Sequence, residues 1–415
     1  MRNYIFYPLI VLFFIYGCTA RTPAGSKITF FTWVPLEEER VNKSLIKEFE
    51  TQNPGTKIEY INDPDRQAMQ KLQVMFAGNE SPDIMSIHGA YFLPFASRGF
   101  LLPLDEFIDK CRELKLSDFY PKLINGCKYR GTLYSLPRYT SVYVLFYNRN
   151  LFDGEGLTYP GENFTWDDFL NAAKRLTKDT NNDGVIDQFG STMDFWGARI
   201  YPWIWQNNGR IFDTENNLCL LNDKNTVEAI QFLVDLRYRH KVVPLVLPVE
   251  YKSNVEMFRT GKIGMFISGA WDIQGLRSEK AIPWNIGPLP KNKKKATMLG
   301  MENYAISSRT KNKELSYKFL EFILGKESQL LMAEKLDKQP SLVEAGKIFA
   351  EGKKSYDRKV LTDTLEYGLL PPNLMKYSEI ELVLQQELDL IWLKKKTVKE
   401  GLESATKKIN AILKE

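Results

Sequence analysis

The sequence predicts an α/β protein of two lobes, and three observations support this prediction. The chain has 415 residues, whereas a single hydrophobic core stops growing near about 250–300 residues. Between residues 28 and 87, short apolar runs alternate with amphipathic segments, which is typical of strands and helices around a parallel sheet. Residues 131–148 read as extended chain with no helix between their halves, and 299–306 is a second stretch of this kind. We expect both stretches to cross from one lobe to the other.

The first lobe is predicted to begin with three strands and two helices. The run 28–33 is apolar and rich in β-branched and aromatic residues, as in a strand that is buried on both faces. The other expected elements are a helix at 37–50, a strand at 57–61, a helix around Met69–Phe76 and a strand at 83–87. In such sheets ligands lie beyond the carboxyl ends of the strands. These ends bring together residues 33–35, 63–67 and 88–91.

The later elements follow from caps and helical spacing. Thr165 with acids after it is typical of a helix start, and apolar residues in 226–239 follow a helical period. Further elements are expected as a strand at 258–267 with a turn at 268–272, a strand at 285–289, a helix at 315–324, and helices at 380–391 and 398–412.

The composition excludes several classes of function. A net charge of +5, spread over this length, is too small to indicate nucleic-acid binding. His88 and His240 are the only histidines, so a multi-histidine metal site is ruled out and a histidine-based catalytic triad is disfavoured. The 8 Trp, 20 Tyr and 25 Phe residues are the feature that points to a function.

The N-terminal segment predicts export and lipidation. One early charge and roughly a dozen apolar residues indicate a signal peptide over 1–17, since a spanning helix needs about 20. The run Ile15–Cys18 resembles the bacterial lipobox, in which Cys18 receives a diacylglycerol, and 18–26 would be a tether. The alternative is a plain signal peptide. Either way, we expect an extracytoplasmic protein.

Three further cysteines, Cys111, Cys127 and Cys219, leave at least one thiol unpaired within the chain. Cys111 and Cys127 could form a disulfide in an oxidising compartment. We favour small buried thiols instead.

Blocks spread over residues 27–413 together resemble one known family, the extracellular solute-binding proteins of ABC importers, and within it the carbohydrate-binding, maltose-binding-protein-like group. Each block alone is weak, whereas their order along one chain is specific. The blocks are 30–33, 49–58, 77–84, 99–105, 133–137, 147–152, 165–169 and, most strongly, 261–271.

This resemblance implies the periplasmic-binding-protein fold, in which two α/β lobes are joined by a multi-crossing hinge. Lobe one would be 27–137 plus 303–337, and lobe two 141–301 plus 341–415. A carbohydrate ligand would close the lobes by hinge bending, and the permease subunits of the importer would recognise the closed form. The protein would be a monomer anchored to the membrane by its lipid, at the cell surface or in the periplasm, with no enzymatic activity.

Sugars present apolar C–H faces and many hydroxyls, so their sites combine aromatic platforms with planar polar groups. Trp271 is the first candidate, because it follows small residues and matches the position that stacks on sugar in the family. The alternative for Trp203 and Trp205 is that they are core residues of a helix. The full set of expected ligand contacts is Trp33, Arg66, His88, Tyr139, Asp194, Trp196, Arg199, Trp203, Trp271 and Glu302.

Residues 179–187 resemble the first part of an EF-hand-like calcium loop, with Gly184 at its sixth position. The twelfth position is Gly190, so the bidentate Glu is missing. The alternative is an Asx- and glycine-rich turn. A structural Ca²⁺ is therefore a candidate, and no cofactor is required; the calcium ligands would be Asp179, Asn181, Asp183 and Asp187.

Other functions stay open at this point. A glycoside-cleaving enzyme would need a carboxylate pair, and nothing in the sequence singles one out. The same fold could present its ligand to a sensor. Arg66, Arg138 and Arg199 could together bind a phosphorylated solute such as a glycerol phosphate.

Overall fold

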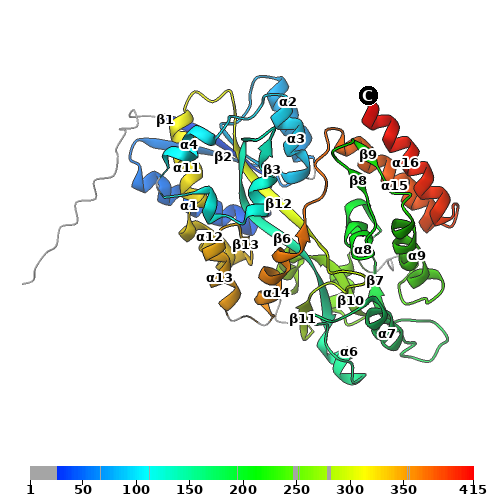
Figure 1. Ribbon diagram of the computed structural model, residues 1–415. Helices are drawn as coiled ribbons and strands as arrows, with labels where there is room; N and C mark the ends of the chain where they lie inside the picture. The colour runs from blue at the N-terminus through cyan, green and yellow to red at the C-terminus, as the bar shows by residue number, and fades with distance from the viewer. Residues whose placement is uncertain are drawn as a thin grey trace, which may run out of the picture.

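The computed structural model describes residues 26–415 except 66, 112, 194, 246–250, 252, 278–281, 353 and 355. The predicted signal peptide and Cys18 lie outside the described residues, as do Arg66 and Asp194. Figure 1 shows two lobes, with β6 and β12 running from one into the other.

The strands of the described chain are β1 (Ser26–Thr32), β2 (Thr56–Asn62), β3 (Ile84–His88), β4 (Lys128–Tyr129), β5 (Thr132–Leu133), β6 (Ser135–Asn148), β7 (Phe189–Thr192), β8 (Phe212–Asp213), β9 (Leu218–Cys219), β10 (Ile263–Gly269), β11 (Trp284–Gly287), β12 (Thr297–Ile306), β13 (Gln339–Pro340) and β14 (Gly368–Leu369).

The α-helices are α1 (Leu36–Gln52), α2 (Ala68–Ala77), α3 (Gly89–Ser97), α4 (Asp105–Lys110), α5 (Pro121–Asn125), α6 (Arg149–Gly154), α7 (Trp166–Leu176), α8 (Tyr201–Gln206), α9 (Lys224–Tyr238), α10 (Asn254–Arg259), α11 (Lys313–Leu324), α12 (Lys326–Leu336), α13 (Val343–Glu351), α14 (Arg358–Asp363), α15 (Tyr377–Trp392) and α16 (Val398–Lys414). The 3₁₀ turns are η1 (Leu116–Asp118), η2 (Gly197–Ile200), η3 (Ala270–Leu276) and η4 (Thr364–Glu366).

The strands of lobe one follow the order β2-β1-β3-β12-β6. β1 runs parallel to β2 and β3, whereas β12 runs antiparallel to β3 and β6. The predicted strands at 28–33, 57–61 and 83–87 are confirmed. Because β1, β2 and β3 are parallel, their carboxyl ends meet at the same edge of the sheet, which faces the second lobe.

β6 and β12 are shared between the lobes. Residues 135–142 of β6 pair with β12, while residues 143–148 pair with β10 and β11. The strand β13 pairs with β6 at Tyr139 and Thr140 and adds a third connection at the same place. The two stretches that the sequence predicts to cross between the lobes are therefore adjacent, hydrogen-bonded strands.

Separate cores fill the two lobes. Phe30, Phe49, Phe319 and their neighbours form the core of lobe one, and a larger cluster joins β6 and β10 to helices α7 to α9, α15 and α16 in lobe two. The strand expected at 258–267 is partly wrong. Residues 254–259 form α10, and β10 begins only at Ile263, because Met257 and Phe258 pack as one turn of a helix into a further cluster with Phe146, Phe266 and Ile273.

Cys111, Cys127 and Cys219 are free thiols. The prediction of small buried thiols is confirmed for Cys127 and Cys219, whereas Cys111 is only half-buried. Burial raises the pKa of Cys127 to about 12, so this thiol stays protonated and unreactive. Within the described part of the chain, no helix is both long and apolar enough to cross a membrane.

Gly190 of β7 lies against helix α7 so closely that any side chain would collide with backbone. A Cβ at this position would be 1.9 Å from the carbonyl oxygen of Ala173. The glycine at the twelfth position of the calcium-like loop is therefore explained by helix-on-sheet contact.

The Gly190→Ala variant should lose about 1–3 kcal/mol of unfolding free energy, because the helix must move to admit the methyl group. Denaturation in urea would measure this loss. Gly154→Ala is the matched control, since no atom lies within 4 Å of a Cβ there. Equal stability of the two variants would contradict the close contact between α7 and β7.

Candidate functional site

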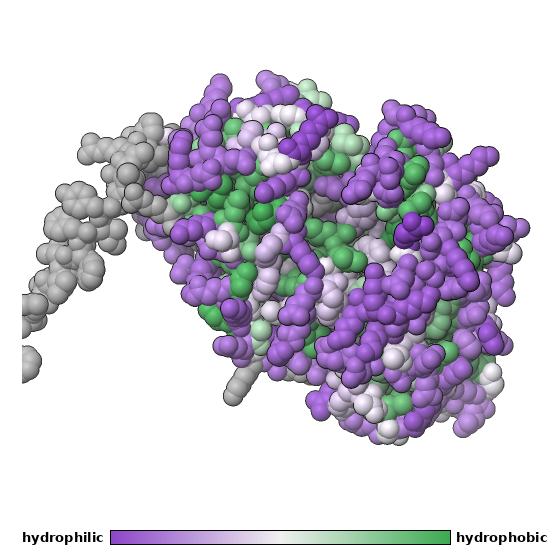
Figure 2. Space-filling model, viewed as in Figure 1, coloured by the Kyte–Doolittle hydropathy of each residue, from purple (hydrophilic) through white to green (hydrophobic). Residues whose placement is uncertain are grey.

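A cavity of about 720 Å³ lies between the two lobes, around the crossing strands. Its walls come from the segment after β1, the end of β3, both crossing strands, η2, η3 and residues 370–381. Figure 2 shows apolar side chains reaching the surface in the hollow between the lobes, while hydrophilic side chains cover much of the outer face. The crevice predicted at the carboxyl ends of the strands is present for residues 33–35 and 88–91, whereas none of the described residues in 63–67 lines it.

Three charged residues from distant parts of the sequence meet at the lobe-one wall. Glu38 of α1 is buried and forms ion pairs with Arg138 of β6 and with Lys338, whose Nζ lies 3.1 Å from Glu38 Oε2. The guanidinium of Arg138 also donates to Ser86 Oγ at 3.2 Å. Burying these charges is tolerable because each has an opposite charge in contact.

Tyr139, a predicted contact, lies between these cations. The Arg138 guanidinium is 4.5 Å from the centre of its ring, and Lys338 Nζ is 4.4 Å from it. Lys338 also donates to the Tyr139 hydroxyl at 3.3 Å. These contacts fix the ring at the cavity wall.

Glu302, another predicted contact, lines the cavity from β12, opposite His88 of β3 in the sheet register. Its Oε2 has no hydrogen-bond partner in the structure. Burial raises the pKa of Glu302 to about 7, although Arg138 and Lys338 act in the opposite direction. The carboxyl group therefore titrates near neutral pH and offers an unused polar atom to a ligand.

His88 and Trp33 supply hydrogen-bond donors beside this acid. The Ala90 N–H donates to His88 Nδ1 at 3.3 Å, and burial lowers the pKa of His88 to about 4. At neutral pH the ring is uncharged and carries its hydrogen on Nε2. Trp33 stands edge-on to it, with ring centres 6.0 Å apart, and its Nε1–H has no partner.

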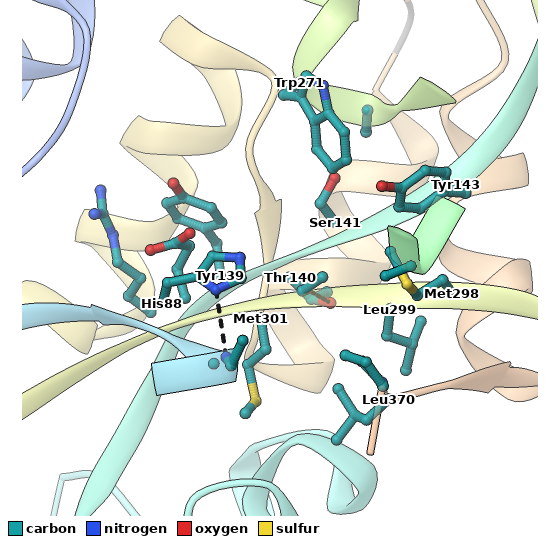
Figure 3. A pocket seen from close by; sticks show the side chains of 18 of the residues that line it. His88, Tyr139, Thr140, Ser141, Tyr143, Trp271, Met298, Leu299, Met301 and Leu370 are labelled. Atoms are coloured by element: carbon teal, nitrogen blue, oxygen red, sulfur yellow. Dashed lines mark hydrogen bonds between the residues drawn. The ribbon is translucent and has the colours of Figure 1, made fainter. Parts of the chain in front are cut away.

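The lobe-two wall is aromatic. Trp271 and Trp196 are 41% and 48% exposed although they are large apolar groups. The ring of Tyr143 meets Trp271 edge to face at 5.2 Å. A Cβ on Gly269 would lie 2.0 Å from the Trp271 ring, so this glycine lets the indole lie against the backbone. Figure 3 shows Trp271 and Tyr143 across the cavity from His88 and Tyr139.

Arg199 lies near an acid and a phenol of the same wall. It interacts electrostatically with Asp272, and it hydrogen-bonds with Tyr143, which moderates the effect of burial on the pKa of that phenol. Ser268 donates to Asp272 at 2.5 Å. The charge of Arg199 is therefore partly compensated within lobe two.

The two lobes touch through aromatic rings at one side of the cavity. Tyr91 of α3 and Tyr377 of α15 have ring centres 6.4 Å apart. The Tyr377 hydroxyl donates to Glu381 Oε1 at 3.2 Å. These residues line the same cavity as Trp33 and Trp271.

Trp203 is wrong as a predicted ligand contact. Its side chain is 1% exposed and packs against Trp166, Phe169 and Phe232 in the lobe-two core. Helix α8 turns Trp203 towards α7 and α9, so the aromatic cluster at 195–205 is divided between core and cavity. Trp196 borders the cavity instead.

The calcium-like loop is held by its own hydrogen bonds. Asp179 accepts from the amides of Asp183 and Gly184, while Asp187 accepts from Thr180 and lies 3.5 Å from Lys262 Nζ. No group of three or more His, Cys, Asp or Glu side chains is arranged to hold a metal in the described parts of the chain. A Ca²⁺ held by Asp179, Asn181, Asp183 and Asp187 stays a prediction.

Several cavity residues were missed by reasoning from the sequence. Met301 is one of them: a Cβ on Gly126 would lie 2.6 Å from its ε-methyl, so Met301 fills space beside this glycine. In the sequence, only the position of Met301 within the crossing stretch could have indicated that it lines the cavity. The missed residues include Glu38, Ser141, Tyr143, Met298, Leu299, Met301, Lys338, Leu370, Tyr377 and Glu381.

Comparisons with known proteins bear on this site. The sequence model described as "Bacterial extracellular solute-binding protein" matches residues 36–330. A maltotriose-binding protein of Pyrococcus abyssi is 22% identical over 312 residues, which are 73% of this chain and 64% of that protein. A galactooligosaccharide-binding protein of Bacillus subtilis is 22% identical over 394 residues, covering 92% and 88%.

A solved structure has the same fold. It is an ABC substrate-binding protein from Listeria monocytogenes in complex with cycloalternan, with a TM-score of 0.84 and 24% identity. The alignment covers 94% of this chain and 99% of that one.

The Glu302→Gln variant should change how stability depends on pH. The folded state holds the Glu302 proton more tightly than the unfolded chain, whose carboxyl titrates at its ordinary pKa of 4.5. The stabilisation from this proton is fully present below about pH 4.5 and is lost as the pH rises through about 7. Gln stays neutral, so at about pH 8 the free energy of unfolding of the variant should exceed that of the wild type by on the order of 3 kcal/mol.

Urea unfolding at several values between about pH 5 and about pH 8 would measure this difference. Glu80→Gln, at an exposed position, is the control and should follow the wild-type curve. A difference between Glu302→Gln and wild type that does not grow with pH would contradict the buried position of the acid.

Proposed function

The chain belongs to the family of bacterial extracellular solute-binding proteins, and on this premise we propose that it binds an uncharged oligosaccharide between its lobes and delivers it to the permease of an ABC importer. The observation that carries this proposal is the pairing of half-exposed aromatic rings on one cavity wall with unpartnered polar atoms on the other.

The aromatic wall suits the apolar faces of sugar rings. Trp196 and Trp271 keep large flat surfaces exposed in the cavity, where ligand burial would recover their hydrophobic area. A cavity of about 720 Å³ has room for more than one ring. These features favour an oligosaccharide over a single small solute.

The polar wall suits hydroxyl groups. Trp33 Nε1–H and His88 Nε2–H are donors, and Glu302 Oε2 is an acceptor without a partner. A sugar hydroxyl both donates and accepts, so it can satisfy groups of either kind. An apolar ligand would leave them buried and unpaired, at a cost of about 1–3 kcal/mol each.

The charges of the described cavity favour an uncharged ligand over a phosphorylated one. Arg138 and Lys338 are paired with Glu38, and Arg199 has Asp272 as an acidic neighbour. A phosphate would have to compete with these acids for the cations. The phosphate cluster considered from the sequence also needs Arg66, which lies outside the described residues.

The site of action follows from the family and from the N-terminus. Extracellular solute-binding proteins act outside the cytoplasm. We propose that Cys18 carries the lipid that holds this protein at the membrane, and that it works as a monomer without catalysing a reaction. Its closed form would then present both lobes to the permease.

A thermal-shift screen of the purified protein tests the proposed ligand class. A solute that binds only the folded state raises the melting temperature by mass action. We expect a rise with one family of neutral oligosaccharides and none with glycerol phosphates. A rise with an anionic solute alone would overturn the sugar assignment while leaving the family unchanged.

Two tryptophan variants should separate binding from folding. Trp271→Ala should weaken binding of the ligand from that screen by about 10- to 100-fold, because it removes a stacking surface. Its effect on stability should be small, since the ring is 41% exposed.

Trp203→Ala is the matched control in the core. It should lose about 3–5 kcal/mol of stability, while the molecules that remain folded bind with wild-type affinity. Titration calorimetry and urea unfolding would measure both quantities. Normal binding by Trp271→Ala would show that this tryptophan does not contact the ligand.

A further inference from the structure

Asn62 holds the backbone that carries Trp33, although its own side chain does not line the cavity. It ends strand β2 and pairs with Thr32, the last residue of β1. Trp33 follows directly, at the point where the chain leaves the sheet and turns into α1. Outside a sheet, a short segment of this kind has no ladder hydrogen bonds to fix it.

The Asn62 amide makes four hydrogen bonds to this segment and to the start of α1. Its Oδ1 accepts from the Val34 amide at 2.9 Å and from Thr32 Oγ1 at 3.0 Å. Its Nδ2 donates to the Val34 carbonyl at 2.9 Å and to Glu39 Oε2 at 2.9 Å. The side chain thus bonds both the N–H and the carbonyl of Val34, as a neighbouring strand would do in a sheet.

This position requires an amide. Two acceptor contacts and two donor contacts use the full capacity of an asparagine side chain. Aspartate has no donors and would set a second carboxylate against Glu39. Hydrogen bonds from Lys43 and Asn62 hold the pKa of Glu39 below its ordinary value, so Glu39 is ionised and would repel that carboxylate.

The segment between β1 and α1 carries the Trp33 side chain, which lines the cavity. Trp33 has an unpartnered, buried Nε1–H and stands against the His88 ring. No hydrogen bond holds this indole in the described structure, so its direction depends on the backbone on either side of it. Errors of about 1 Å in the placement of a binding group are costly.

We propose that Asn62 is a positioning residue for ligand binding, which fixes the Trp33 segment so that the indole is preorganised for the sugar. This proposal rests on the proposed function, because it assumes that Trp33 contacts the ligand. Asn62 acts through Trp33 and does not touch the ligand itself.

A double-mutant cycle with Trp33 tests the proposal. Asn62→Ala should weaken binding of the oligosaccharide found in the thermal-shift screen roughly tenfold, and Trp33→Ala by at least as much. The double variant should bind like Trp33→Ala alone, because Asn62 has nothing left to position. Wild-type affinity for Asn62→Ala, or losses that multiply, would overturn the proposal.

Asn410 supplies a matched control far from the cavity. It holds Cys219 in the same manner, accepting from its amide at 2.8 Å and donating to its carbonyl at 3.2 Å. Asn410→Ala should lower the melting temperature while changing the affinity by less than about twofold. If Asn410→Ala lost as much affinity as Asn62→Ala, the effect of Asn62→Ala would be explained by a general loss of stability, and the proposal would be overturned.

A measurement without ligand separates this inference from the proposed function. In protein labelled with 5-fluorotryptophan, the ¹⁹F signal that disappears in Trp33→Phe belongs to Trp33. Asn62→Ala should shift or broaden that signal, and Asn410→Ala should not. An unchanged Trp33 signal overturns the inference, even if the protein proves to bind no sugar.

If Asn62→Ala fails to fold, Asn62→Asp is the second variant. It keeps the size of the side chain and both acceptor contacts, and it loses the two donor contacts. It should also disturb the Trp33 signal, and adding Glu39→Gln, which restores a donor opposite the new carboxylate, should partly reverse the change. No disturbance in Asn62→Asp would contradict the role of the amide.

Discussion

The strands β6 and β12 belong to the sheets of both lobes, and the remaining structure depends on this sharing. β6 pairs with β12 over residues 135–142 and with β10 and β11 over residues 143–148. β12 pairs with β3 over residues 302–306 and with β14 at residues 297–298. The pairing register of β6 with β12 therefore determines where the strands of lobe two can begin to pair. The cavity walls come from the residues at which β6 and β12 change their pairing partners. Side chains of adjacent strands at this point face the cavity because neither lobe covers them.

The same place carries the buried charges. Glu38, Arg138 and Lys338 come from a helix, a crossing strand and the third connection. Their pairing fixes all three segments at the base of the cavity and leaves no bare cation there among the described residues. Glu302 is different, since its unpartnered oxygen is tolerable only when protonated or in contact with a ligand. The charges at the floor of the cavity are thus paired, while a few polar atoms of its wall have no partner.

Glycines decide where the aromatic and apolar walls lie. Gly269 lets the Trp271 indole approach the backbone, and Gly126 gives room to the Met301 side chain. In the same way, Asn62 holds the residue after Trp33 through hydrogen bonds to the N–H and the carbonyl of Val34. The geometry of the walls is therefore set by residues that do not themselves recognise a ligand.

The sequence by itself determined the α/β class, the positions of most strands and helices, the two crossing stretches, and the placing of Trp33, His88 and Trp271 at or just beyond strand ends. These follow from local periodicity and from the rule that parallel strands end at one edge. Only the tertiary structure decided that Trp203 is core while Trp196 borders the cavity, because both lie in one short aromatic run. It also decided the contacts of Glu38 with Arg138 and Lys338, and of Tyr91 with Tyr377. Residues so far apart along the chain meet through sheet register and helix packing, and no local pattern encodes such a meeting.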